Sequence, residues 1–119
     1  MSDVFVTPPP TISTESVLDF LYNHYGFSAS IEKLSSDRDL NFKVSSKEKT
    51  YVMKIANSSE DFKVLEMQNN ALRFIASQDE KIEVPLPIES NQKKDITIIE
   101  DPSGKYLSLI HISEPTRLR

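Results

Sequence analysis

The sequence contains no cysteine, and its other scarcities exclude several classes of protein. Without cysteine the chain has no disulfides and no thiolate metal site, so a reducing compartment is permitted. No apolar run approaches the roughly 20 residues that span a bilayer, and the first residues lack the basic stretch and apolar core of an export signal. Acidic residues outnumber basic ones by 18 to 14, which argues against nonspecific nucleic-acid binding. The composition predicts a cytoplasmic protein without nucleic-acid or membrane partners.

Histidine is also scarce, because His24 and His111 are the two in the chain. A zinc or iron site needs several such ligands at close spacing, and neither residue has a second histidine nearby. We interpret His24 as a partly exposed residue near a helix end. We therefore predict no metal ligands in this sequence.

Residue spacing predicts two helices. The first is capped by Ser13 or Thr14 and stops at Gly26, a residue typical of helix ends. The second runs from residue 59 or 60 to residue 77 and has an acidic first turn. Each helix has an apolar stripe with spacings of three and four: Val17, Leu18, Leu21, Tyr22 and Tyr25 on the first, and Phe62, Leu65, Leu72 and Ala76 on the second.

Shorter apolar runs separated by polar turns predict an antiparallel meander. The predicted strands are 31–34, 41–44, 50–56, 96–99 and a fifth that begins at 105–106. An extended connection with two prolines, 84–87, precedes the fourth strand, and a turn at 102–104 follows it. The fold class is α+β, with about five mostly antiparallel strands, one long packed helix and a short leading helix. Residues 1–12, with three consecutive prolines, are predicted to be an extended arm.

Lys54 is chemically suggestive because it lies inside the apolar strand 51–56, where a cation needs an anion or water. Glu66 follows twelve residues later and shares a polar strip of the second helix with Asn70 and Arg73. A strand lysine followed by a helix glutamate is how protein-kinase-like folds hold nucleotide phosphates. The alternative is an edge-strand lysine that reaches water, with Glu66 and Arg73 on a solvated helix face.

The loop 35–39 joins the first two predicted strands and contains no glycine, so it is neither a Gly-rich loop nor a Walker motif. Serine hydroxyls, backbone amides and Arg38 are able to contact phosphates, whereas Asp37 and Asp39 oppose them unless turned away or bridged by a metal ion. A solvated hairpin turn explains the same composition.

Several segments together resemble the start of an aminoglycoside-phosphotransferase domain, most closely that of hydroxylysine-kinase-like enzymes. The most specific part is Arg38–Phe42 followed by Val52–Asn57, and the similarity covers about residues 18–106. The segments that carry it are Tyr25-Gly26-Phe27, Leu34-Ser35-Ser36-Asp37-Arg38-Asp39-Leu40-Asn41-Phe42, Tyr51-Val52-Met53-Lys54-Ile55-Ala56-Asn57 and Glu66-Met67-Gln68-Asn69-Asn70-Ala71-Leu72.

The resemblance implies a protein-kinase-like amino-terminal lobe and an ATP- and magnesium-dependent phosphotransferase that acts on a hydroxyl of a small amine-bearing molecule. It assigns the nucleotide phosphates to Lys54, with Glu66 as the partner of this lysine on the helix. The loop over the nucleotide is assigned to Ser35, Ser36, Asp37, Arg38 and Asn41. No catalytic residue is assigned, since the proton acceptor and the magnesium ligands belong to the second lobe.

The stretch Leu107–Arg117 resembles translated sequencing-adapter DNA, the transposase end used in library preparation. We therefore expect three parts: the arm 1–12, a partial kinase-like lobe 13–106, and a tail 107–119 that is an artefact and contributes to no site. The alternative for the tail is a genuine carboxyl-terminal segment. Strand five is then expected to be cut off after Tyr106, and the chain alone to be inactive.

Two other functions stay open at this stage. The same domain occurs ahead of a class III aminotransferase in some large proteins, which makes the chain the first piece of a pyridoxal-phosphate-dependent fusion. A noncatalytic binding module with the kinase fold is the other alternative, because fold alone does not fix function. The oligomeric state and the acceptor molecule do not follow from these residues.

Overall fold

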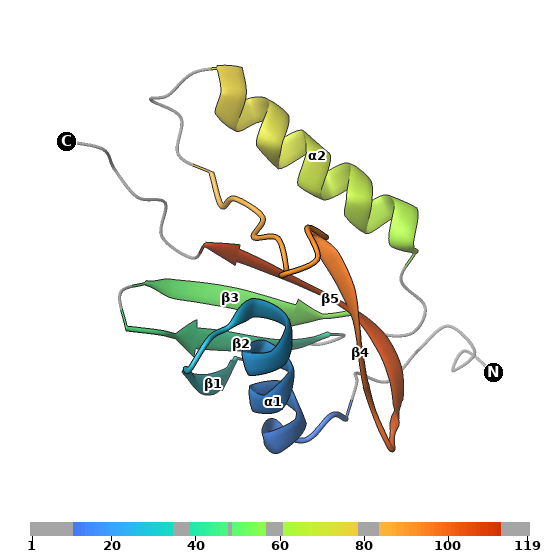
Figure 1. The fold of residues 1–119 in the computed structure, drawn as a ribbon. Coiled ribbons are helices and arrows are strands. Elements are labelled where there is room, and N and C mark those ends of the chain that lie inside the picture. Colours follow the sequence, from blue (N-terminus) through green and yellow to red (C-terminus); the bar gives the residue numbers. More distant parts are fainter. Residues whose placement is uncertain (1–10, 35–38, 48, 57–60, 79–83, 113–119) are drawn as a thin grey trace.

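A five-stranded antiparallel sheet forms the centre of the protein in the computed structural model, which describes residues 11–34, 39–47, 49–56, 61–78 and 84–112 (Figure 1). The strand order is β1-β2-β3-β5-β4. The elements are α1 (Thr14–Tyr25), β1 (Ser30–Leu34), β2 (Leu40–Ser45), β3 (Thr50–Ile55), α2 (Phe62–Gln78), β4 (Ile96–Asp101) and β5 (Gly104–Ile112). The α+β class, the sheet, the long helix and the short leading helix are thus confirmed.

Helix α1 has the ends that its sequence predicts. The side chain of Ser13 accepts a hydrogen bond from the backbone N–H of Ser16 at 3.2 Å, which satisfies one of the free donors of the first turn. Gly26 has φ +72, and its N–H donates to the carbonyl of Tyr22 at 3.1 Å. The N–H of Phe27 reaches the carbonyl of Leu21, which completes the usual left-handed helix end.

The main core lies between α1 and one face of the sheet. Side chains of alternate strand residues point to this face, as the pleat requires. Its fully buried members include Val17 and Leu21 on α1 and Met53, Ile55 and Ile110 on the sheet. Two details of the predicted stripe differ, because Phe20 is buried at 7% exposure while Tyr22 is 64% exposed. The rings of Phe20 and Tyr25 lie 6.0 Å apart with their planes tilted by 54°, so the buried stripe extends toward Phe20 and away from Tyr22.

Helix α2 packs on the opposite face, where a smaller cluster comprises Ala56, Leu65, Ile96 and Leu109. Leu109 and Ile110 are consecutive residues of β5 and enter different clusters, which places α1 and α2 on opposite faces of the sheet. Asp61 caps α2 by accepting from the N–H of Lys63 at 2.8 Å, so the helix begins at Phe62 rather than at residue 59 or 60, two residues that lie outside the described part. Neither described helix is long and apolar enough to cross a membrane.

Strand β5 is longer than expected. Its first residues pair with β4 and not with β3. Gly104, for example, lies opposite Asp101, and Tyr106 lies opposite Ile99. All of its pairing with β3 comes from Ser108–Ile112, beyond the point where the strand was expected to be cut off. Ser108 and Ile110 are fully buried. Residues 107–112 therefore complete the sheet. This pairing does not depend on whether they come from the natural protein or from adapter DNA.

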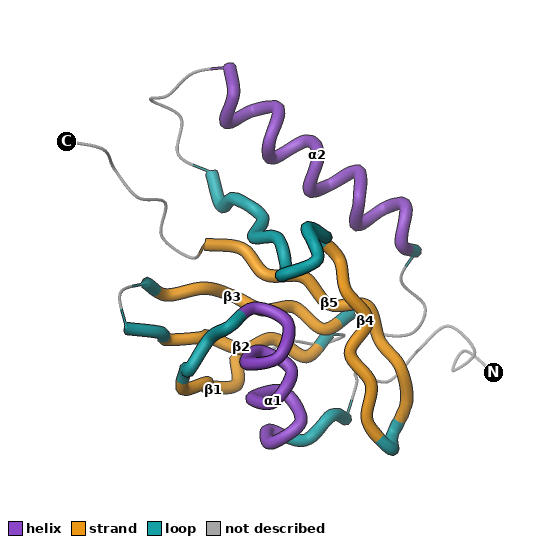
Figure 2. Tube along the Cα trace, viewed as in Figure 1, coloured by secondary structure: helices purple, strands orange, loops and turns teal. Residues whose placement is uncertain are grey.

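The extended connection before β4 runs beside the end of β5, as predicted for its two prolines (Figure 2). The N–H of Ile88 donates to the carbonyl of Ile110 at 2.9 Å, and the N–H of Ile112 donates to the carbonyl of Leu86 at 3.0 Å. Pro87, which has no N–H, faces His111 between these two bonds. The predicted arm 1–12 lies outside the described residues except for its last two.

A chain that stops after Tyr106 should lose cooperative folding. The truncation removes every residue that joins β3 to β5 and takes Leu109 and Ile110 out of the two clusters. Each loss of that kind costs about 2–5 kcal/mol, and small domains have about 5–15 kcal/mol of stability in total. Urea unfolding followed by circular dichroism tests this, with truncation after Ile112 as the matched control. A sharp transition in the shorter chain, equal to that of the control, would contradict the expectation.

Candidate functional site

Lys54 lies in the middle strand of the sheet and points to the α2 face. In the strand register it stands between Asn41 of β2 and Leu109 of β5, and Leu109 belongs to the cluster under α2. Since opposed residues of antiparallel strands point to the same side, all three share this face. The side chain of Lys54 is 28% exposed. The alternative of an edge-strand lysine is therefore wrong, because β3 has a neighbour on each side.

The ammonium of Lys54 forms an ion pair with Asp39. The distance from Nζ to Oδ2 is 3.4 Å, and the aspartate side chain is 16% exposed. The expected need for an anion is thus met, but by the residue just before β2 rather than by the helix. Asp39 and Asn41 are two residues apart and share a face, so Asp39 is a diagonal neighbour of Lys54. Alternation along β2 places Asp39 and Asn41 on one face, but only the register of β2 with β3 brings Asp39 to Lys54.

Asn41 lies beside the ion pair, and its Oδ1 atom is buried without a hydrogen-bond partner among the described residues. A buried amide oxygen left in this state costs about 1–3 kcal/mol relative to a bonded one. The group was predicted to contact the nucleotide. Asn41 stands opposite Lys54 in the strand register, so the two side chains share the α2 face.

Glu66 is exposed on α2 and does not meet Lys54; among the described residues the ion pair that Lys54 forms is with Asp39. Leu65 and Asn69 point toward the sheet instead, at 1% exposure each. At 100° per residue, Glu66 is turned away from the direction of Leu65 by more than a quarter of a rotation. Together with Asn70 it lines a cavity beside β4. Two residues of the predicted polar strip of α2 thus line a cavity at the edge of the sheet that β4 forms.

Arg73 continues this strip and ties α2 to the loop before β4. Its Nε and Nη2 donate to the two carboxylate oxygens of Asp95, with 3.3 Å for the Nε bond, and Nη2 also reaches the carbonyl of Pro87 at 3.4 Å. Such a two-pronged guanidinium–carboxylate contact fixes orientation as well as distance.

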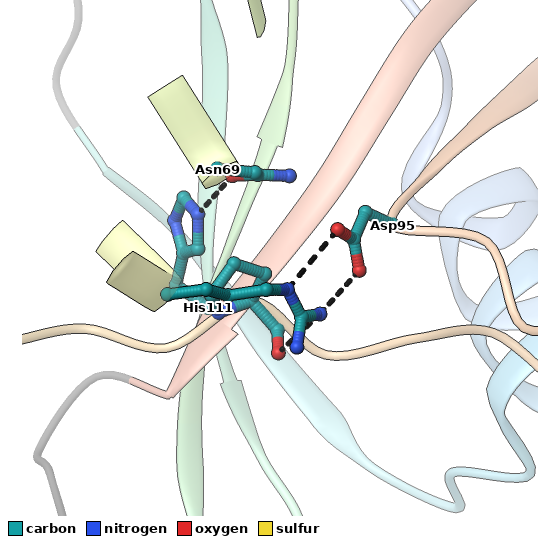
Figure 3. A network of polar contacts seen from close by, with 5 residues as sticks. Asn69, Asp95 and His111 are labelled. Atoms are coloured by element: carbon teal, nitrogen blue, oxygen red, sulfur yellow. Dashed lines mark hydrogen bonds and ion pairs between the residues drawn. The ribbon is translucent and has the colours of Figure 1, made fainter. Parts of the chain in front are cut away.

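Asn69 was not anticipated as a buried residue, because the predicted stripe contained apolar residues alone. Phe62, which the stripe did include, is 45% exposed. The Oδ1 atom of Asn69 lies 2.8 Å from Nε2 of His111, across the interface between α2 and β5 (Figure 3). Its Nδ2 atom is buried without a partner in the described part of the chain. His111 was expected to belong to no site, yet it holds the helix to the sheet. Burial lowers the pKa of His111, and the nearby charge of Lys54 lowers it further.

The predicted loop residues Ser35, Ser36, Asp37 and Arg38 lie outside the described residues. Within the described part no group of three or more histidine, aspartate or glutamate side chains is placed to hold a metal ion. The described residues of the α2 face therefore include a cation and an amide suited to phosphate oxygens, and they include no carboxylate cluster suited to magnesium.

A cavity beside β4 does not include Lys54 among its lining residues. It measures about 660 Å³ and lies at the outer edge of the sheet. It is bounded by α2, by the loop before β4 and by the end of α1, and its walls include Phe62, Glu66, Lys94, Ile96 and Ile98. We regard Lys54, Asp39 and Asn41 as the candidate site, since they gather a partly buried charge and an unbonded polar atom on one face.

Comparisons with known proteins identify the fold. No family model matches the sequence, and no curated protein matches it. Solved structures do match, among them the following three. An amicoumacin kinase in complex with AMP-PNP, Ca²⁺ and its ligand is similar with a TM-score of 0.73 and 19% identity, over 89% of this chain and 32% of that one. A microcompartment-associated aminopropanol kinase gives 0.69 and 11%, over 82% and 31%.

The third match is a spectinomycin phosphotransferase in complex with ADP and spectinomycin, with a TM-score of 0.58 and 15% identity, over 89% of this chain and 31% of that one. At such identities the likeness establishes the fold alone. The chain has the fold of the amino-terminal lobe of small-molecule kinases of the aminoglycoside-phosphotransferase type. It spans about a third of the length of each structure it matches.

The burial of His111 should make stability depend on pH. Because the pKa of His111 is lowered in the folded state, the unfolded chain binds more protons than the folded chain below about pH 6.5. The stability that neutral His111 contributes is therefore complete above that pH, and it is lost as the pH falls toward the pKa of His111 in the folded state. The free energy of unfolding, measured with urea between pH 8 and pH 5, should fall more steeply than that of His111→Gln, whose amide still donates to Asn69. Parallel curves would contradict this assignment.

Proposed function

We propose that this chain is the amino-terminal lobe of an ATP-dependent phosphotransferase that acts on a hydroxyl of a small amine-bearing molecule, hydroxylysine-like or aminoglycoside-like. The observation that carries the proposal is Lys54 on the middle strand of a kinase-type lobe, partly buried, on the α2 face and opposite Asn41. The ligands of two similar structures, AMP-PNP and ADP, support a nucleotide as the partner of this fold.

Lys54 is the residue that binds the nucleotide phosphates in this proposal. Asp39 now holds the ammonium at 3.4 Å and keeps it directed across the α2 face. A phosphate has more negative oxygens than one carboxylate, so it displaces or shares this contact when it binds. Asn41 orients the same ligand through its amide, whose Nδ2 donates to phosphate oxygens. Magnesium, bound between the phosphates, would supply charge neutralisation, and its protein ligands belong to the second lobe.

Glu66 is proposed as the partner of Lys54 in the nucleotide-bound protein. It approaches the lysine only if α2 turns about its axis, because Leu65 and Asn69 occupy the inward direction here. The contacts that resist such a turn are the hydrogen bond of Asn69 to His111 and the ion pair of Arg73 with Asp95. Ser35, Ser36, Asp37 and Arg38 complete the proposed site as the loop over the phosphates.

The 119-residue chain alone should be inactive. The proton acceptor for the substrate hydroxyl, the magnesium ligands and the substrate pocket are proposed to lie in a second lobe that follows this one. We propose accordingly that residues 107–119 derive from adapter DNA, and that the natural reading frame continues from Tyr106 in the cytoplasmic parent enzyme. A single long read of the source DNA across codon 107, prepared without a transposase step, tests this. A stop codon directly after Arg119 in the native molecule would overturn it.

Phosphate transfer should depend on Lys54 in the protein encoded by the continued reading frame. We expect Lys54→Met to lower kcat/KM for ATP-dependent phosphorylation of hydroxylysine or an aminoglycoside by at least about a hundredfold, as loss of one charged phosphate ligand does. Lys43→Met is the matched control, because Lys43 is exposed on the same sheet face one strand away. Equal activity of the two variants would remove Lys54 from the site. Turnover by the 119-residue chain itself, abolished by Lys54→Ala, would show that one lobe suffices.

A further inference from the structure

The two edges of the sheet differ in how well they are protected. β1, at one edge, is short and carries Lys33, a charge that discourages pairing with another strand. β4, at the other edge, reads Ile-Thr-Ile-Ile-Glu-Asp, with four β-branched residues in a row and no lysine or proline. Its outer side pairs with no strand among the described residues. A strand of this composition is a template for a further strand.

Open space lies directly along this edge. The cavity of about 660 Å³ is lined by the consecutive residues Ile96, Thr97 and Ile98 of β4 and also by Phe62 of α2. Ile98 is 59% exposed and Phe62 is 45% exposed, so apolar surface faces solvent on both sides of the space. An added strand would therefore cover apolar side chains as well as backbone groups.

The charges that flank β4 are opposite at its two ends. Lys93 and Lys94 precede the strand, and Glu100 and Asp101 close it. Lys94 and Glu100 are exposed, whereas the carboxylate of Asp101 already accepts from Ser103 and from the backbone N–H of Ser13. A second copy running antiparallel brings its acidic end opposite the basic end of the first copy. The edge is thus complementary in charge to itself.

We propose that two copies of this chain associate through β4, edge to edge and antiparallel, to form one continuous ten-stranded sheet. The interface goes beyond the kinase proposal and does not depend on it. A twofold axis at Thr97 places Lys94 opposite the partner's Glu100 and Ile96 opposite the partner's Ile98. Because opposed residues share a face, both isoleucine pairs lie on the α2 side, where Ile98 enters the space beside Phe62.

The charges also disfavour shifts of the register in one direction. A shift by one residue places Asp95 opposite the partner's Glu100, and a shift by two places Asp95 opposite the partner's Asp101. Like charges directly opposed destabilise a strand pair, so both alternatives are disfavoured. The twofold arrangement is closed, because each copy offers the other the same edge and leaves no β4 edge for a third copy.

Sedimentation equilibrium of the 119-residue chain tests the interface at several concentrations and at low salt. We expect a reversible monomer–dimer equilibrium. Lys94→Glu and Glu100→Lys should each raise the dissociation constant about tenfold, because each change turns two symmetric attractions into repulsions. An equimolar mixture of the two variants should dimerise about as tightly as the original chain, since the heterodimer restores both opposite-charge pairs. Lys43→Glu, on exposed β2 surface, should change nothing.

Three results would overturn the proposal. The first is a monomer at every concentration tested, and the second is a mixture that dimerises no better than the single variants. The third is a dimer that ignores both charge changes but is lost with Phe74→Glu, which would place the interface on the outer face of α2, where Met67 is 64% and Phe74 is 65% exposed. Melting curves equal to that of the original chain show that each variant remains folded.

Discussion

Strand β5 determines where the rest of the molecule lies, because it is hydrogen-bonded to β3 on one side and to β4 on the other. Its two faces supply both cores, with Ile110 under α1 and Leu109 under α2. The same strand aligns Lys54 with Leu109 and so fixes the lysine on the α2 face. The extended connection before β4 also takes its place from β5, through Leu86 and Ile88. Sheet order, helix placement and the candidate site therefore all depend on one pairing arrangement.

The two helices are held in physically different ways. Helix α1 buries four apolar side chains, and its Tyr25 hydroxyl is hydrogen-bonded to Thr97 at 3.3 Å. Helix α2 buries one leucine and one asparagine. Two polar contacts also attach it to the rest of the protein, from Asn69 to His111 and from Arg73 to Asp95. Apolar packing strengthens with every atom that is buried, whereas polar contacts exchange readily for others. The orientation of α2 is thus the less costly one to change, and α2 is the helix that carries Glu66.

The sequence predicted what depends on local rules. Ser13 and Gly26 mark the ends of α1 because capping chemistry acts within a few residues, and strand positions followed from alternation. Prediction from the sequence was wrong where the position of a residue depends on a partner far away in the chain. Asn69 is buried because His111 meets it, and Asp39 reaches Lys54 only through the register of β2 with β3. The predicted length of β5 was also too short, because residues 107–112 were assigned to an adapter-derived tail although their apolar residues suit a strand.

The position of β5 in the chain has a consequence for how the protein folds. β3 ends at Ile55, and its partner on that side begins at Ser108, after α2 and β4 have been made. Helices and the β1–β2–β3 meander form from neighbouring residues, but the sheet closes only when this distant strand is inserted between β3 and β4. Contacts of such long sequence separation slow folding, because a large loop must close before they are made. On the ribosome, β3 therefore waits with one edge unpaired until β5 emerges, which makes this interval a time when a chaperone would be useful.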